Sequence, residues 1–353
     1  MKVLIVAEFT EGALGVSYSN AFKKNGCEVY NFDLINEFNK VNPFSANRYL
    51  NSLFGYLFYP AVNKRLLDEV KLNKPDLVFI IKGAFVFPGT LIDIKNKTNS
   101  LLFCFNPDNP FNFNKGASNK NIRESIPYYD CYFIWGKFLI PELIKVGAKR
   151  VQYLPFAYDP ELHYPVKVGE EEKKMFGSDI AFIGSYDKER EKFLMSLVDY
   201  DLAIWGNGWD KLSLFSPLKK KWKDRDVIGE DFSKVCNSSK IVLNHIRKQN
   251  NSAHNMKTFE IPACKGFMLT MRTKEQCEFF EEGKDIACFE TPEELRSKIK
   301  QFLNDLEARN NMRENVYKKV QKHSYNVRVE DILNISGKCH SEEPIRSAQG
   351  KLQ

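Results

Sequence analysis

The sequence predicts an α/β protein with two parallel, doubly wound sheets in tandem, on three observations. Short buried strands alternate with helices through the first half of its 353 residues. A proline-rich and charged stretch, 155–178, then interrupts this rhythm as a linker would. The rhythm restarts at Asp179–Gly184, a second strand that ends on glycine. Strands and helices that alternate at this spacing build a parallel sheet covered on both faces.

In the first half, the apolar runs are short and bounded by turn residues, as expected for buried strands. Gly26 and Gly147 each follow a helical pattern, at the place where glycine commonly ends a helix. Strands are predicted at 2–7, 28–33, 77–81, 101–105, 131–135 and 151–154, and helices at 17–25, 60–73, 88–96 and 138–146.

The second half continues the alternation as a second Rossmann-like domain. Its strands are predicted at 179–183, 202–205, 241–244 and 266–270, and its helices at 189–198, 255–264, 292–307 and 309–322. We therefore expect a first domain at 1–165, a second at 175–322, a C-terminal helix at 323–336 that returns to the first domain, and a polar, disordered tail at 337–353.

Composition limits the class of protein. No apolar run approaches the roughly 20 residues of a membrane helix, and the run after Met1 ends at Glu8, so we expect no signal peptide. The eight cysteines form no CxxC pair and are expected to be reduced thiols of a cytoplasmic protein, without a zinc site.

The net charge of +7 suits a protein that handles anions. The densest basic run, Lys219–Lys223, is short and is interpreted as a solvated surface, so no nucleic-acid partner is expected. The aromatic-rich stretch Tyr49–Tyr59 leaves peripheral membrane contact open, although packing against the core of the first domain is preferred.

The segment from Asn255 to Phe267 is the most specific in the sequence. It predicts a helix that begins near Asn255, whose free amides suit a diphosphate. Lys257 and Thr258 lie in its first turn, where Lys257 adds a positive charge. Glu260 lies one turn further and can accept hydrogen bonds from two ribose hydroxyls. The alternative is an ordinary surface helix with one exposed glutamate.

This segment resembles the C-terminal domain of bacterial glycosyltransferases of the group 1 type, and is most similar to the spore-maturation-protein-like branch. The family's F-x-x-G-K-E/D-I and D/T-P-E-E-L patterns follow in order as Phe280–Ile286 and Thr291–Leu295. Lys257 stands where arginine is usual, and Ser252 where many retaining relatives carry a glutamate. The anomeric outcome therefore stays open.

What the resemblance implies is a GT-B architecture, with two Rossmann-like domains facing a central cleft. The first domain would hold an unknown acceptor, and the second a nucleotide-diphosphate sugar as substrate. The family generally needs no metal, and no cofactor is expected. The alternative is a non-catalytic or epimerase-like nucleotide-sugar-binding protein of the same fold.

Other motifs add donor-binding candidates. Gly184, Ser185 and Arg190 resemble the opening of the donor domain, where a glycine admits the diphosphate and an arginine neutralises it. Gly206 belongs to a G-x-G-W-like loop, and Asn244 ends a strand at the same edge.

The first domain supplies three candidates. Asp108 lies in a loop resembling the family's W-x-x-D-D-P pattern and is the candidate general base, although a capping turn is the competing interpretation. Gly12 and Gly15 lack a full G-x-G-x-x-G pattern and are expected to shape the acceptor side. Asp224–Asp226 imitates a metal-binding D-x-D but follows no strand, so it is interpreted as accidental.

Overall fold

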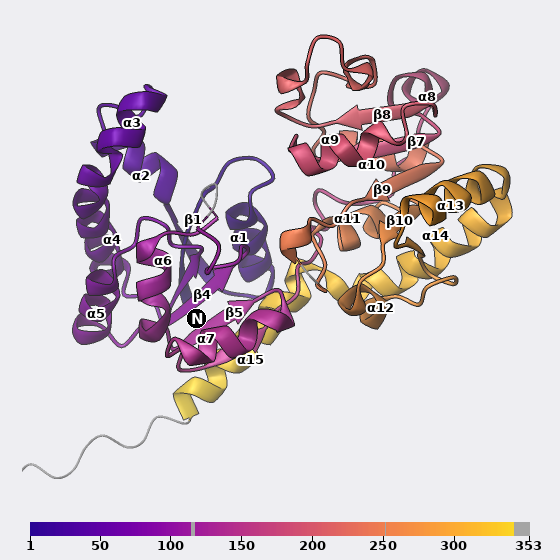
Figure 1. Cartoon of the computed structure of the whole chain (residues 1–353). Coiled ribbons are helices and arrows are strands. Elements are labelled where there is room, and N and C mark those ends of the chain that lie inside the picture. Colours follow the sequence, from indigo (N-terminus) through magenta and orange to yellow (C-terminus); the bar gives the residue numbers. More distant parts are fainter. Residues whose placement is uncertain (114–116, 251, 342–353) are drawn as a thin grey trace, which may run out of the picture. The chain divides into compact units, whose positions relative to one another are not determined.

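The computed structural model describes residues 1–113, 117–250 and 252–341. The chain divides into two compact units, each built around one parallel sheet (Figure 1). Unit 1 contains residues 1–133, 142–152 and those from Asn326 onward, and unit 2 contains 134–141 and 153–325. The predicted α/β class with two Rossmann-like sheets is confirmed.

The first sheet has six strands in the order β2-β1-β3-β4-β5-β6, and β1 pairs in parallel with both β2 and β3. The chain runs from β1 to β2 on one side and then crosses to β3 on the other, so the switch point where ligands bind in such folds lies between the carboxyl ends of β1 and β3. The strands are β1 (Lys2–Ala7), β2 (Glu28–Asp33), β3 (Leu77–Ile81), β4 (Leu101–Asn106), β5 (Cys131–Ile134) and β6 (Val151–Tyr153).

The helices of the N-terminal half include three that the sequence patterns missed, α2, α3 and α6. All three are short, so their apolar periodicity is weak. The helices are α1 (Leu14–Lys24), α2 (Leu34–Val41), α3 (Arg48–Phe54), α4 (Tyr59–Asn73), α5 (Pro88–Lys97), α6 (Lys120–Ser125) and α7 (Ile140–Lys145).

The long helix α15 (Tyr325–Ser341) groups with unit 1 from Asn326 onward, and the Asn25 side chain donates a 3.1 Å hydrogen bond to the Asn326 carbonyl. Of the tail predicted at 337–353, the part 337–341 is the end of this helix, and 342–353 lies outside the described residues.

The second sheet has five strands in the order β11-β10-β9-β7-β8, and β7 pairs in parallel with β8 and β9. Its switch point lies between the carboxyl ends of β7 and β9. The strands are β7 (Ile180–Ile183), β8 (Leu202–Trp205), β9 (Ile241–Asn244), β10 (Met268–Met271) and β11 (Ala287–Phe289). The helices are α8 (Glu170–Phe176), α9 (Lys188–Met195), α10 (Glu230–Ser238), α11 (Lys257–Ala263), α12 (Lys274–Phe279), α13 (Pro292–Asn304) and α14 (Leu306–Val320).

Two sequence expectations about packing are wrong. The charged run 169–174, expected within a linker, starts helix α8, because Phe176 at its end is buried and stacks on Trp205. In the stretch Tyr49–Tyr59, expected in the core, Tyr49 is 82% exposed, since α3 packs through the Phe44–Phe54 contact instead.

Within the described ranges, no helix is both long and apolar enough to cross a bilayer.

Candidate functional site

The loops that follow β7 and β8 interlock through two glycines. The Gly184 amide donates to the Trp205 carbonyl at 2.8 Å, and the Gly184 carbonyl accepts from the Trp209 indole at 2.8 Å. Gly206 has φ +133°, and a Cβ built on it would clash with the Gly184 carbonyl oxygen. Only glycine fits at position 206. Trp205 and Trp209 are both buried, so they brace this loop from within.

Arg190 lies in the first turn of α9, directly after this glycine loop. Asp187 caps the helix by accepting from the Arg190 amide at 2.8 Å, and the Arg190 guanidinium donates to the Ser185 carbonyl at 2.7 Å. Burial, followed by repulsion from Arg247, lowers the pKa of Arg190 to about 10. Its Nε atom is buried and makes no hydrogen bond within the described residues. Arg190 therefore keeps an unused donor at the switch point.

Arg247 is a second cation at the same place, and the sequence patterns did not predict it. Its Nε donates to Asp187 Oδ2 at 2.8 Å, and Arg190 Nε lies 3.7 Å from that same oxygen. Two guanidinium groups thus share one carboxylate. The sequence feature that could have identified Arg247 is its position three residues after the buried strand that ends at Asn244.

His245 lies between these charges and packs on the Phe193 ring, with centroids 4.7 Å apart. Burial, followed by the positive charge of Arg190, lowers the pKa of His245 to about 4. The ring is therefore neutral near pH 7. Its buried Nδ1 makes no hydrogen bond in the described part of the chain.

Helix α11 carries Lys257 and Glu260, which bind each other. Lys257 Nζ donates to Glu260 Oε2 at 2.7 Å, and His163 Nε2 lies 3.9 Å from Glu260 Oε1. Burial works against ionisation of Glu260, but Lys257 and His163 together leave its pKa below the usual range. Glu260 is only 6% exposed, so the expectation of an exposed glutamate is wrong. The helix turns the carboxylate inward, toward Lys257 and His163.

Three further predicted residues form a buried polar network. The Asn255 side chain accepts from the Thr258 amide at 3.2 Å and donates to Asn244 Oδ1 at 2.8 Å. The Thr258 hydroxyl donates to Gln276 Oε1 at 2.9 Å. Because Asn244 and Thr258 are almost fully buried, their side chains fix the end of β9 against α11 and α12. Gln276, which completes the network, carried no motif signal.

In unit 1, the carboxyl ends of β3 and β4 bring Lys82 and Asp108 together. Lys82 Nζ donates to Asp108 Oδ2 at 2.7 Å, and both side chains are about one-third exposed. Lys82 has φ +66°, a conformation that costs a non-glycine residue energy and that concentrates at functional sites. The sequence reasoning missed Lys82, although it follows the apolar strand 77–81 directly.

The glycines expected on the acceptor side lie at the start of α1. A Cβ on Gly15 would clash with the Glu8 carbonyl oxygen, so this glycine lets α1 approach the end of β1 closely. Gly12 has φ +76° in the turn before the helix. Both roles shape the switch point of the first sheet.

Two further features are a cluster of possible metal ligands in unit 2 and a cavity in unit 1. Among the described residues, Cys277, Glu282 and Cys288 bring metal-ligating atoms within 4.8 Å of one another, but Glu282 already accepts two 2.8 Å bonds from Arg272. A metal ion there would have to displace a guanidinium.

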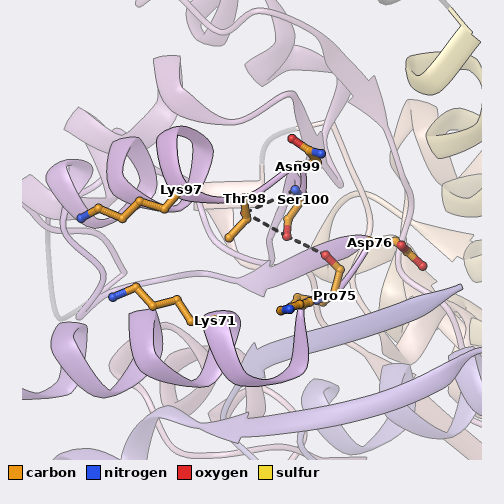
Figure 2. A pocket seen from close by; sticks show the side chains of 8 residues that line it. Lys71, Pro75, Asp76, Lys97, Thr98, Asn99 and Ser100 are labelled. Carbon is orange, nitrogen blue, oxygen red and sulfur yellow. Dashed lines mark hydrogen bonds between the residues drawn. The ribbon is translucent and has the colours of Figure 1, made fainter.

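Figure 2 shows a cavity of about 470 Å³ that includes Lys71, Lys97 and Ser100. It opens beside the segments that precede β3 and β4. It therefore lies at the amino ends of these strands, away from the edge that carries Asp108.

Comparison with known proteins agrees with this arrangement. Residues 189–334 match a family model described as glycosyl transferase-like. This range includes Arg190, Arg247, Lys257 and Glu260. No curated protein matches the chain.

Solved structures share the whole fold at low identity. Sucrose-phosphate synthase from Thermosynechococcus elongatus has a TM-score of 0.72 at 11% identity, over 97% of this chain and 99% of that one. HepE from Anabaena, solved with UDP and glucose, has a TM-score of 0.65 at 11% identity, over 96% and 100%.

A protein of another activity is also similar. A UDP-N-acetylglucosamine 2-epimerase described as putative, from Listeria monocytogenes, has a TM-score of 0.55 at 11% identity, with both chains covered completely. These likenesses establish the fold, which is that of GT-B glycosyltransferases, while the sequence match of residues 189–334 is glycosyl transferase-like.

Proposed function

We propose that this protein is a glycosyltransferase that takes a sugar from a nucleoside-diphosphate donor bound at the carboxyl edge of the second sheet. The observation that carries the proposal is the pair Arg190 and Arg247, which share the single carboxylate of Asp187 beside a glycine-lined switch point. The site thus holds two guanidinium groups beside Asp187, with the Glu189 carboxylate 3.7 Å from His245 Nε2, and guanidinium groups bind phosphate oxygens well. The family match over this region and the UDP complex of HepE support the same assignment.

Within this proposal, Arg247 is the cation that reaches the diphosphate first, because it is more exposed than Arg190. Arg190 holds the glycine loop through Ser185 and offers its unused Nε donor. Lys257 adds a third positive charge, and Glu260 Oε1, which makes no hydrogen bond within the described residues, accepts a ribose hydroxyl. Asn244, Asn255 and Thr258 support this edge through the buried network.

Unit 1 is proposed to bind the acceptor, with Asp108 as general base. Its Oδ2 atom is held by Lys82, which leaves Oδ1 to take the proton of an acceptor hydroxyl. Such a base is what an inverting transfer requires.

The proposal is tested by incubating the protein with UDP-, GDP- and ADP-sugars and following release of the nucleoside diphosphate. A glycosyltransferase transfers the sugar slowly to water and faster to an acceptor. The nucleoside diphosphate is therefore released faster when an acceptor is present. The proposal predicts release from at least one donor and loss of this release in Arg247→Ala. No release and no nucleotide binding by any donor would contradict it.

A second candidate function is epimerisation of a nucleotide sugar, favoured by the full-length likeness to the Listeria protein. An epimerase returns an isomerised sugar without any acceptor. Analysis of the sugar product by NMR therefore separates the two functions. A changed configuration at a ring carbon other than the anomeric one would favour the epimerase.

A further inference from the structure

Unit 2 carries a second surface feature, at residues 211–223, which we call the basic loop. Its tip, Leu214 and Phe215, is 81% and 95% exposed, while Leu212 and Leu218 on either side are buried. The Ser216 amide donates to the Ser213 carbonyl at 2.9 Å, so the two apolar residues occupy the corners of a closed turn. The loop is thus anchored at both ends and holds a leucine and a phenylalanine in water.

The segment that carries the tip has a net positive charge. Residues 206–223 contain five lysines and one acidic residue, Asp210, which gives a formal charge of +4. Lys221 donates to the Tyr200 carbonyl at 2.7 Å. In the described part of the chain, the other four, Lys211, Lys219, Lys220 and Lys223, form no ion pair. About half of the other lysines of this unit do, as Lys173 and Lys174 do with Glu170 and Glu171.

Exposed apolar side chains beside unpaired lysines match the chemistry of an anionic membrane surface. The tip can enter the boundary between headgroups and acyl chains, while the ammonium groups stay among the lipid phosphates. A nucleic acid could stack a base on Phe215 but would leave Leu214 in water, so it fits less well than a bilayer, which buries both side chains. We propose that the basic loop docks this protein on a bilayer rich in anionic phospholipid.

The expected strength follows from the two contributions. Each lysine close to an anionic surface strengthens binding about fivefold. Burial of the phenylalanine and leucine side chains adds about tenfold or more. Attachment is therefore reversible and sensitive to salt, since exposed charges are screened. This inference does not depend on the donor site, because the basic loop contains none of the residues proposed there.

The test is co-sedimentation of the full chain with vesicles made of equal parts phosphatidylcholine and phosphatidylglycerol, against vesicles of phosphatidylcholine alone. We expect binding to the anionic vesicles only. The double variant Leu214→Ser/Phe215→Ser should bind about tenfold or more weakly, and Lys219→Gln/Lys220→Gln about tenfold or more weakly.

Matched controls remove the same chemistry elsewhere. Leu72→Ser takes away another strongly exposed leucine, on α4, and Lys173→Gln/Lys174→Gln takes away two paired lysines of the same unit. Both should bind like the wild type. Equal binding to the two kinds of vesicle, no binding, or full binding by the tip variant would overturn the proposal. So would tighter, equally loop-dependent binding to single-stranded DNA without vesicle binding.

Discussion

The two sheet edges carry the same chemical pair in different settings. In unit 1, Lys82 and Asp108 come from the ends of two neighbouring strands, and both remain about one-third exposed. In unit 2, Lys257 and Glu260 share one helix, and Glu260 is buried. Unit 2 adds Arg190 and Arg247 around one carboxylate, whereas the Lys82–Asp108 pair is balanced in charge. The edge of unit 2 is therefore suited to an anion, and the edge of unit 1 to a neutral hydroxyl group.

Burial explains why the two pairs would act differently. A carboxylate that keeps solvent access can exchange protons with a substrate, so Asp108 is suited to acid–base chemistry. A buried carboxylate held by a lysine stays ionised and serves as a fixed acceptor. Under the proposed function, proton transfer therefore belongs to unit 1 and donor recognition to unit 2.

The largest expected effect concerns Asp108. Asp108→Asn keeps the shape of the side chain but removes the base, so turnover should fall by roughly 10²-fold or more, with donor affinity unchanged. Steady-state kinetics and nucleotide titration measure the two quantities. The control is Asp93→Asn, which alters another carboxylate paired with a lysine in unit 1. If Asp108→Asn retains full turnover, the functional contrast between the two edges fails.

The second prediction uses acid to sharpen the contrast, through His245. Its pKa is about 4 in the folded protein and about 6.5 when unfolded, so below pH 6.5 only the unfolded chain takes up this proton. Stability should therefore fall as the pH drops from about 6.5 to about 4, by up to roughly 3 kcal/mol.

His245→Gln should lose less stability over this pH interval, because the variant has no imidazole to protonate. Urea unfolding at the two ends of the interval measures the difference. Equal losses in wild type and variant would show that His245 is not held neutral by the arginine cluster. A bound diphosphate should raise the pKa of His245 by offsetting those charges, which NMR titration of the ring can follow.

The smallest expected effect concerns Glu260. Glu260→Gln keeps an acceptor for Lys257 but loses the negative charge, so nucleotide affinity should fall about tenfold. Glutamine is preferred to alanine, because alanine would also leave Lys257 without its hydrogen-bond partner. Glu281→Gln, at an exposed position in the same unit, serves as the control. Unchanged calorimetric affinity in Glu260→Gln would remove the ribose contact from the account.

Sequence patterns predicted the two sheets well, because their strands are short apolar runs ended by glycine or polar residues. Strands 77–81 and 241–244 agree with β3 and β9 residue for residue. The patterns failed where tertiary contacts decide the structure. Phe176 stacks on Trp205, and this contact stabilises a helix in the charged run. No local sequence pattern predicts the contact.

The sequence predicted which strand ends carry the candidate site, but not which side chains pair with one another there. Arg190 and Lys257 were predicted from motifs. Arg247 and Lys82 follow strands but belong to no motif. Burial of Glu260 depends on His163, far away in the sequence, which no pattern around position 260 could reveal. A search for charged residues that follow each buried strand would have found both missed cations.

The central claim is that a nucleoside diphosphate binds between Arg190 and Arg247. The most direct measurement is calorimetric titration of UDP, GDP and ADP into the wild type, Arg247→Ala and Arg296→Ala. Arg296 is the matched control, because it pairs with Asp199 in the same unit but lies beside Asp179 and Lys240, at the amino ends of the strands.

The account predicts that at least one nucleotide binds the wild type and Arg296→Ala equally, and binds Arg247→Ala about tenfold to a hundredfold more weakly. Equal affinity in all three proteins, or binding by none, would contradict it.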